Sequence, residues 1–272
     1  MYGSRLKETL IDGVFVQAPK FSRLMMFSLT AAAFIAAGCS DSTTYAVAPE
    51  NRPRLVSRPN PYIHPSLTAG LHRLTWNNTR IIAYVPPSAY ARTSMPVVLL
   101  LHGSARDAEQ LVEAQRAAAD RDGVVILAPY AALDSWDAIY TTFGPDVEGI
   151  DRALAWLFDR LPVNPSKVAI TGFSDGATYS LAIGRANGDL FSHVIAYSPG
   201  FVLDVVPVGN PQIAISHGTY DEELPYSNTR DRIVPKLRED GYEVDFRTFE
   251  GPHWIFQELA EEVFDELGGG SK

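Results

Sequence analysis

The residues best able to do chemistry lie in segment 172–176, which reads Gly-Phe-Ser-Asp-Gly. The segment follows an apolar run and precedes a helix-forming stretch, 177–186. A serine in a sharp strand-to-helix turn is exposed above the sheet edge, beside a helix N-terminus whose N–H groups favour negative charge. So tight a turn needs glycine two residues before and after the serine. The pattern predicts that Ser174 is a nucleophile for acyl transfer; the alternative is a glycine-rich turn with a solvated serine.

A serine hydroxyl is a weak nucleophile at its ordinary pKa, so it needs a base and an acid that orients the base. In this strand–turn–helix setting the acid and then a histidine follow the serine. Of the six histidines, three come after Ser174: His193, His217 and His253. His253 alone lies between the last expected strand and the last expected helix, so we favour it as the base. His193 precedes a buried strand, and His217 is expected to shape a loop.

The favoured acid is Asp221, which follows Gly-Thr-Tyr at the end of the penultimate expected strand. Its loop should lie beside the loop that carries His253, so the carboxylate could hold the imidazole in the required tautomer. Glu222, Glu223 and Asp204 remain alternatives, because carboxylates in loops are usually only solvated.

Acyl transfer also needs hydrogen-bond donors for the developing oxyanion. The sequence Leu-His-Gly-Ser at 101–104 ends the first long apolar run, and its glycine lets backbone N–H groups turn inward. We expect the N–H groups of Ser104 and Asp175 to be these donors. The Asp175 carboxylate should then point away from the oxyanion, and His102 should brace the loop.

Strand-like and helix-like stretches alternate along the chain and would position these residues. A hairpin is expected from 71–75 and 80–85, and a helix over 146–160 is expected to be capped by Asp146. Further apolar runs, typical of buried strands, are 97–101, 124–127, 168–170, 194–197, 213–215 and 244–246. Helical stretches are expected at 108–120, 177–186, 228–240 and 254–267. This alternation predicts an α/β fold with a parallel sheet covered on both faces and the site at the carboxyl ends of its strands.

The first residues read as an export signal. Lys20 and Arg23 precede the uncharged run 24–37, which is shorter than the ~20 residues of a membrane span and ends on small residues before Cys39. The arrangement resembles a bacterial lipoprotein signal, which implies lipidation of Cys39; a cleaved signal with a free cysteine and an uncleaved anchor are the alternatives. We expect a periplasmic or cell-envelope lipoprotein of a bacterium, or otherwise a secreted protein.

The remaining chain divides into a tether and one domain. Residues 39–65 are polar and then rich in spaced prolines, so we expect them to be a tether after a signal peptide at 1–38. We place the catalytic domain at 66–268 and a short tail at 269–272.

Composition excludes several classes of protein. The 272 residues are 46% hydrophobic, enough for a sizeable core, and the formal charge of −9 argues against a nucleic-acid partner. The single cysteine allows neither an intramolecular disulfide nor a thiolate metal cage, and we expect no metal site. Sequence signatures of nucleotide-binding loops and zinc proteases are absent.

From about residue 71 to 267 the chain resembles the α/β-hydrolase superfamily. It is most similar to small bacterial serine esterases of the phospholipase/carboxylesterase type, close to polyhydroxybutyrate-depolymerase-like and feruloyl-esterase-like proteins. The likeness is carried by segments 101–104, 172–176, 216–221 and 224–225, and by His253. The resemblance implies a Ser174, Asp221 and His253 triad, with the N–H groups of Ser104 and Asp175 as oxyanion donors.

The resemblance also implies that no cofactor takes part and that the substrate is a small-molecule, lipid or polymer ester. Contact with a membrane is expected only through the N-terminal lipid anchor. Loop aromatics could form a substrate wall, foremost Trp136, Phe201 and Trp254, although ordinary packing explains them equally well; Tyr130, Tyr140 and Phe143 are further candidates. Segment 130–145 is too short for a large lid. Alternatives are another acyl transfer on the same triad, such as thioester or peptide hydrolysis or transfer to an acceptor, and a non-catalytic binding protein.

Overall fold

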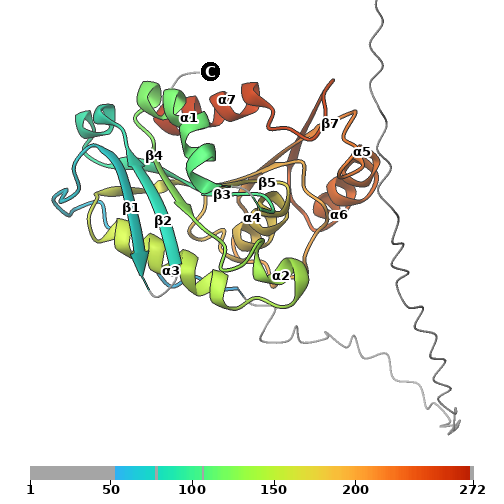
Figure 1. Ribbon diagram of the computed structural model, residues 1–272, viewed down its shortest axis with the longest axis horizontal. Coiled ribbons are helices and arrows are strands. Elements are labelled where there is room, and N and C mark those ends of the chain that lie inside the picture. Colours follow the sequence, from blue (N-terminus) through green and yellow to red (C-terminus); the bar gives the residue numbers. More distant parts are fainter. Residues whose placement is uncertain (1–52, 77–78, 106, 270–272) are drawn as a thin grey trace, which may run out of the picture. The chain divides into compact units, whose positions relative to one another are not determined.

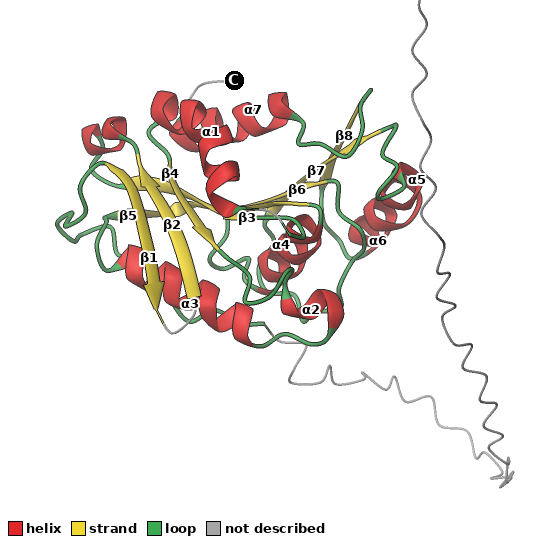
Figure 2. Cartoon of the chain, in the orientation of Figure 1, coloured by secondary structure: helices red, strands yellow, loops and turns green. Residues whose placement is uncertain are grey.

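The computed structural model describes residues 53–76, 79–105 and 107–269, which are built around one eight-stranded sheet (Figures 1 and 2). Its strands are β1 (Gly70–Trp76), β2 (Thr79–Val85), β3 (Met95–Leu101), β4 (Val125–Pro129), β5 (Val163–Phe173), β6 (His193–Tyr197), β7 (Gln212–Gly218) and β8 (Val244–Phe249). Their order is β1-β2-β4-β3-β5-β6-β7-β8. The hairpin of β1 and β2 is antiparallel, β2 is antiparallel to β4, and all pairs from β4 to β8 are parallel. The predicted hairpin and mostly parallel sheet are confirmed.

Helices cover both faces of the sheet, as Figure 1 shows. One face carries α1 (Ala108–Asp122) and α7 (Gln257–Gly268); the other carries α3 (Pro145–Phe158), α4 (Asp175–Ala186) and α6 (Val234–Glu239). Successive residues of β3 serve the two sides, because Val98 and Leu100 pack with α1 and α7, whereas Val97 and Leu99 pack with α3 and α4. This explains the uninterrupted apolar run of β3. Shorter helical turns are Pro87–Ala91, α2 (Asp137–Tyr140), α5 (Tyr226–Asn228) and the π-helical turn Thr229–Ile233.

Helix ends show where local sequence signals hold and where they fail. Asp107 caps α1 by accepting the Glu109 N–H at 2.9 Å, and Gly123 ends the helix in the left-handed conformation with φ 64°. The prediction that Asp146 caps α3 is wrong, because Gly144 occupies the cap. Asp146 instead accepts the N–H groups of Ala132 and Asp137, each at 2.7 Å, and so holds the loop after β4.

Residues 53–58, which we expected to be part of the tether, are attached to the folded domain. Leu55 is 1% exposed, and its N–H donates to Asn187 Oδ1 at 2.8 Å, while Asn187 Nδ2 donates to the Pro53 carbonyl at 2.8 Å. Arg54 and Arg58 form ion pairs with Asp189 at 2.8 and 2.7 Å. The folded domain therefore extends N-terminal of the expected boundary at Ser66.

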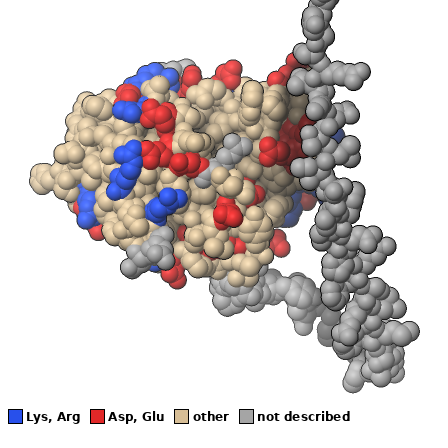
Figure 3. Space-filling view, viewed as in Figure 1, with Lys and Arg blue, Asp and Glu red and all other residues tan. Residues whose placement is uncertain are grey.

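Cys39 and residues 1–38, which we expect to be a signal peptide, lie outside the described residues. In the part that the structure describes, none of the helices is long and apolar enough to cross a membrane. On the face in Figure 3, Asp and Glu side chains lie among Lys and Arg side chains. That face is therefore not uniformly basic.

Candidate active site

Ser174 lies in the turn between the end of β5 and the start of α4, with φ 58° and ψ −120°. A non-glycine residue with positive φ is strained, and such strain persists only when its surroundings enforce it. A Cβ atom on Gly172 would lie 2.1 Å from the Gly176 carbonyl oxygen, and one on Gly176 would lie 2.3 Å from that of Leu101. No larger residue fits at either position, so the predicted sharp turn is confirmed.

The same close approach brings two predicted oxyanion segments together. Leu101 of β3 pairs with Gly172 of β5, and Gly176 at the start of α4 packs against the carbonyl groups of Leu101 and His102. Beyond them the chain turns at Ser104, which is exposed, and at Ala105, whose φ is 49°. The Ala105 N–H donates to the Asp134 carbonyl at 2.8 Å, which anchors the turn.

His102 braces this turn, as expected. Its Nδ1 donates to the Gly103 carbonyl at 2.7 Å, and its Nε2 accepts the Ala131 N–H at 2.9 Å. This pattern requires the neutral tautomer with the proton on Nδ1. Burial lowers the pKa of the His102 imidazole, which also favours the neutral form.

The Asp175 carboxylate is fixed by a neighbouring loop. Ser135, which is 1% exposed, donates its hydroxyl proton to Asp175 Oδ2 at 2.6 Å. Because Asp175 is also the first residue of α4, its negative charge lies at the favourable end of the helix dipole. Ser135 carries no sequence signal for this role, because it lies 40 positions from Asp175.

The predicted acid and base meet in a buried hydrogen bond. His253 Nδ1 lies 2.6 Å from Asp221 Oδ2, and the two side chains are 4% and 0% exposed. The other oxygen of Asp221 accepts the N–H groups of Glu223 and Leu224 at 3.0 and 2.8 Å. A carboxylate that accepts two backbone bonds is held in one orientation.

The alternative acids and bases do not take part in the Asp221–His253 hydrogen bond. Glu222, Glu223 and Asp204 are exposed at the surface. His193 Nε2 lies 3.6 Å from Glu266, at the opposite end of β6 from the site. His217 is buried, and its Nε2 lies 3.0 Å from the same Asp221 oxygen that His253 contacts.

A glycine brings the acid and base loops together. These loops follow the parallel neighbours β7 and β8, and the Tyr220 N–H donates to the Gly251 carbonyl at 3.0 Å. A Cβ on Gly218 would lie 2.3 Å from the carbonyl oxygens of Gly251 and Pro252. Only glycine at 218 therefore lets the two loops approach closely enough for the Asp221–His253 bond.

The Nε2 atom of His253 has no bonded partner in the described part of the chain. It is buried, and among the described residues it makes no hydrogen bond, to Ser174 or to any other group. The His253 ring packs on Phe173, which directly precedes Ser174, with ring centroids 4.6 Å apart. Bonds between base and nucleophile are often long before a substrate binds.

Trp136 is not part of an open substrate wall, which corrects one expectation. It is 0% exposed, stacks on Tyr179 at 5.2 Å and donates its Nε1 proton to the His102 carbonyl at 2.8 Å. Its indole N–H therefore helps to hold the 101–105 turn in place through the His102 carbonyl. Phe201 and Trp254 are 41% and 66% exposed.

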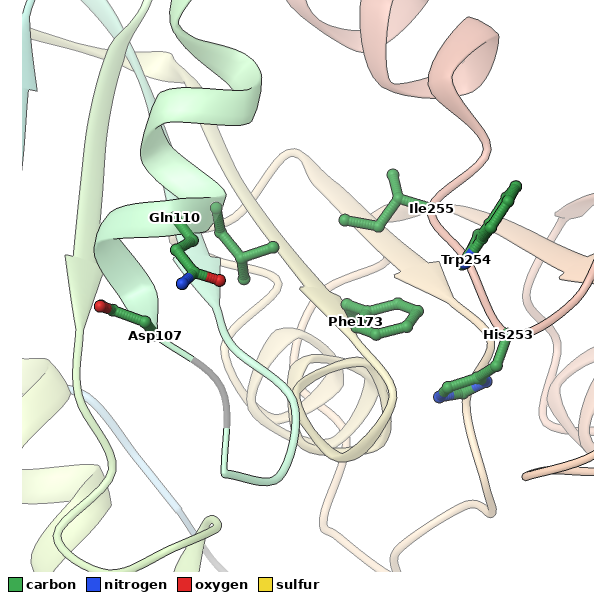
Figure 4. A pocket seen from close by; sticks show the side chains of 7 residues that line it. Asp107, Gln110, Phe173, His253, Trp254 and Ile255 are labelled. Carbon is green, nitrogen blue, oxygen red and sulfur yellow. The ribbon is translucent and has the colours of Figure 1, made fainter. Parts of the chain in front are cut away.

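A pocket of about 320 Å³ opens beside His253 (Figure 4). Asp107, Gln110 and Leu111 line it from the start of α1, and Phe173, His253, Trp254 and Ile255 line it from the other side. Trp254 thus lies where a substrate could touch it. Sequence reasoning missed the α1 residues, because the approach of α1 to the His253 loop has no local signal.

Within residues 53–76, 79–105 and 107–269, no group of three or more His, Cys, Asp and Glu side chains could hold a metal ion.

Comparison with known proteins gives a family for the chain and similar solved folds. Residues 74–236, more than half of the chain, match the family model described as putative esterase. The fold is similar to S-formylglutathione hydrolase from Staphylococcus aureus, at 13% identity, TM-score 0.59, and coverage of 74% of this chain and 99% of that one. It is also similar to an acetyl xylan esterase from Aspergillus awamori, at 16% identity, TM-score 0.58, and coverage of 72% and 99%. A comparison with curated proteins finds no match.

At such identities the structural neighbours establish the α/β-hydrolase fold, and the family model carries the classification. The chain belongs to the putative esterase family and is a carboxylic ester hydrolase with an α/β-hydrolase fold.

Proposed function

We propose that Ser174, His253 and Asp221 form a catalytic triad that hydrolyses carboxylic esters through an acyl-enzyme intermediate. The observation that carries the proposal is the buried 2.6 Å bond from His253 Nδ1 to Asp221, beside a strained serine turn. With Nδ1 donating to a carboxylate, the lone pair of Nε2 is left to accept a proton. This geometry supports the proposal that the chain cleaves esters by the triad mechanism.

In the first half of the reaction, Ser174 Oγ forms a bond to the ester carbonyl carbon while His253 Nε2 takes the hydroxyl proton. Asp221 stabilises the resulting imidazolium without itself being protonated. The carbonyl π electrons move to oxygen, which becomes an oxyanion. When the carbonyl re-forms, the bond to the alcohol oxygen breaks, and Nε2 gives its proton to that oxygen.

Backbone N–H groups of Ser104 and Asp175 would bind the oxyanion. The first N–H groups of a helix have no partner inside the helix, and α4 begins at Asp175. The hydrogen bond from Ser135 holds the Asp175 carboxylate, so that it does not turn toward the oxyanion. One donor of this kind is worth about 10²–10³ in kcat.

In the second half, a water molecule loses a proton to His253 Nε2 as its oxygen attacks the acyl carbon. Collapse of this second tetrahedral intermediate returns the proton to Ser174 Oγ and releases the carboxylic acid. The cycle uses only this chain and water. A transfer to another acceptor, or hydrolysis of a thioester or peptide, would use the same steps.

Hydrolysis of 4-nitrophenyl acetate tests the triad. We expect Ser174→Ala to lower kcat by more than about 10³-fold with the fold intact by circular dichroism. Ser166→Ala is the matched control, because Ser166 is an exposed serine of the same strand. Wild-type turnover by Ser174→Ala would refute the triad, and preferential cleavage of thioacetate over oxyacetate esters would favour the thioesterase alternative.

We also propose that the chain is exported and held to a membrane through a lipid on Cys39. The support is the sequence pattern before Cys39. Expression in a bacterium with labelled palmitate should label wild type and leave Cys39→Ser unlabelled and in the soluble fraction. Equal labelling of both, or none of either, would contradict the anchor without affecting the triad.

A further inference from the structure

The pocket beside His253 has no role in the reaction steps given so far. We propose that it binds the alcohol part of the substrate, and that it selects esters of a single-ring or comparably small apolar alcohol. This inference rests on the proposed triad and adds the substrate class to it.

The position of the pocket follows from the route of the proton. His253 Nε2 must deliver its proton to the leaving oxygen, so the group attached to that oxygen must lie against His253. The pocket wall on this side consists of His253 with the next two residues, Trp254 and Ile255 (Figure 4). Phe173, which directly precedes the nucleophile, lies between this wall and α1.

The size and lining of the pocket define the alcohol. A volume of about 320 Å³ is at the lower end of the range of ~300–1,000 Å³ for small-molecule sites. Phe173, Trp254 and Ile255 offer apolar surface beside His253, whereas Asp107 and Gln110 lie across the pocket at the start of α1 (Figure 4). Leu111 of α1 adds apolar surface on that second side. An apolar ring next to the ester oxygen, with any polar substituent toward Asp107 and Gln110, matches this lining.

Trp254 supports the assignment through its exposure. Its side chain is 66% exposed, although a large aromatic ring gains free energy when it is covered. A bound ring would cover it, and the 2.9 Å bond from its own N–H to the Pro252 carbonyl fixes its backbone beside His253.

Benzyl acetate and methyl acetate test the alcohol assignment, because their alcohols have nearly equal acidity. We expect wild type to prefer benzyl acetate in kcat/KM, and Trp254→Ala to reduce that preference about tenfold. Gln110→Trp, which fills the pocket from an exposed position on α1, should also reduce it. The ratio of methyl butyrate to methyl acetate should stay unchanged in both variants.

Tyr62→Ala is the matched control, because Tyr62 is 91% exposed and does not line the pocket. An unchanged benzyl-to-methyl ratio in both pocket variants would overturn the assignment. A change in the butyrate-to-acetate ratio would also overturn it, because the pocket would then hold the acyl chain. Ser174→Ala in the same assays reports separately on the triad.

A second inference comes from the environment of His217. Its Nε2 lies 3.0 Å from Asp221 Oδ2 and 2.8 Å from the Leu224 carbonyl, and its Nδ1 lies 2.8 Å from Thr229 Oγ1. Two acceptors face Nε2, so Nε2 carries the proton, and Nδ1 accepts the proton of the Thr229 hydroxyl.

The geometry points to His217 as a positioning residue that holds the Asp221 carboxylate for His253. Asp221 Oδ2 is shared by His253 and His217, and the side chains of Asp221 and His217 are both 0% exposed. The two backbone bonds to Oδ1 hold one side of the carboxylate, and among the described residues His217 is the one group besides His253 that contacts Oδ2. Thr229 fixes the His217 tautomer from the π-helical turn at the start of α6.

Steady-state kinetics distinguish positioning from a purely structural role. We expect His217→Leu to lower kcat about tenfold with KM unchanged, because a buried carboxylate loses a hydrogen-bond donor. His217→Gln, whose amide can donate from a similar position, should retain kcat within about threefold of wild type. Thr229→Val should give a smaller loss of kcat. Because valine has nearly the shape of threonine, this variant serves as the test if His217→Leu fails to fold.

Two results would overturn the role of His217. One is wild-type kcat in folded His217→Leu, or in Thr229→Val if His217→Leu does not fold. The other is an equal loss of kcat in His217→Gln and His217→Leu, which would show that the donor is not what matters.

Discussion

The two halves of the site are held by different forces. We call segments 101–105 and 172–176 the nucleophile corner, and segments 217–224 and 251–253 the acid–base corner. In the nucleophile corner, backbone packs on backbone at positions where a Cβ would approach within 2.1–2.3 Å of a carbonyl oxygen. In the acid–base corner, side-chain hydrogen bonds hold a buried carboxylate, although Gly218 is also needed there.

The difference teaches how each corner responds to change. Steric packing allows no intermediate state, so a side chain added at Gly172 or Gly176 in the nucleophile corner should disrupt the fold itself. Hydrogen bonds can be removed singly, so the acid–base corner should lose activity in steps while the fold persists.

The largest effect is expected for Gly176→Ala. The new Cβ would lie 2.3 Å from the Leu101 carbonyl oxygen, so we expect a loss of about 3 kcal/mol or more in the free energy of unfolding. Gly149→Ala in α3 is the control, because its Cβ would make only ordinary contact with Thr79 at 3.4 Å. There we expect a gain of about 0.5–1 kcal/mol. Urea unfolding of both variants checks this. Equal stabilities of the two variants would contradict the claim that steric packing holds the nucleophile corner.

Asp221→Asn should act on activity alone. The amide cannot support the imidazolium, so kcat should fall about 10³–10⁴-fold. Its melting temperature should stay within a few degrees of wild type. Glu223→Gln, an exposed carboxylate in the same loop, is the control and should retain activity. Loss of activity in Glu223→Gln instead would show that another carboxylate is the acid.

These first predictions concern residues that carry a clear signal in the sequence. The tight turn at Ser174 has a local signature in its two glycines, and His253 and Asp221 follow from chain order on neighbouring strands. The uninterrupted apolar run of β3 likewise indicates a sheet covered on both faces, and this signal lies within one short segment.

Features that depend on contacts distant in sequence could not be predicted in this way. Trp136 resembles a loop aromatic, yet packing on Tyr179 buries it. The spaced prolines of 53–59 indicate a tether, yet Leu55 meets Asn187 more than a hundred residues away. Asp146 has the residue type of a helix cap, but its oxygens bind the loop after β4.

A smaller effect is expected for Ser135→Ala, because the Ser135 hydroxyl binds Asp175 of the nucleophile corner. The Asp175 carboxylate would lose the bond that holds it and could turn toward the developing oxyanion. We expect kcat to fall about threefold to tenfold. In an Asp175→Asn background the same substitution should have little effect, because no charge remains to be restrained. An equal loss in both backgrounds would contradict this role of Ser135.

The smallest effect concerns pH, because each corner contains one buried histidine whose pKa is lowered by burial, His102 and His217. The unfolded chain binds protons at these histidines below about pH 6.5, whereas the folded chain binds them only at lower pH. Stability should therefore fall as pH drops below about 6.5, by at most about 1.4 kcal/mol per pH unit for each histidine.

Urea unfolding between pH 7 and pH 5 measures this dependence. His102→Gln and His217→Gln should each make the dependence shallower, and His64→Gln, at an exposed position, should leave it unchanged. Identical slopes in all three variants and wild type would show that neither corner contributes.

The central claim is that Ser174 is the nucleophile activated by His253 and Asp221. Labelling with a fluorophosphonate, followed by mass spectrometry of the proteolytic peptides, tests it most directly. We predict one phosphonyl adduct, on Ser174 in wild type, with labelling strongly slowed in Asp221→Asn and absent in Ser174→Ala. An adduct on another residue, or no adduct on a protein that still hydrolyses esters, would contradict the account.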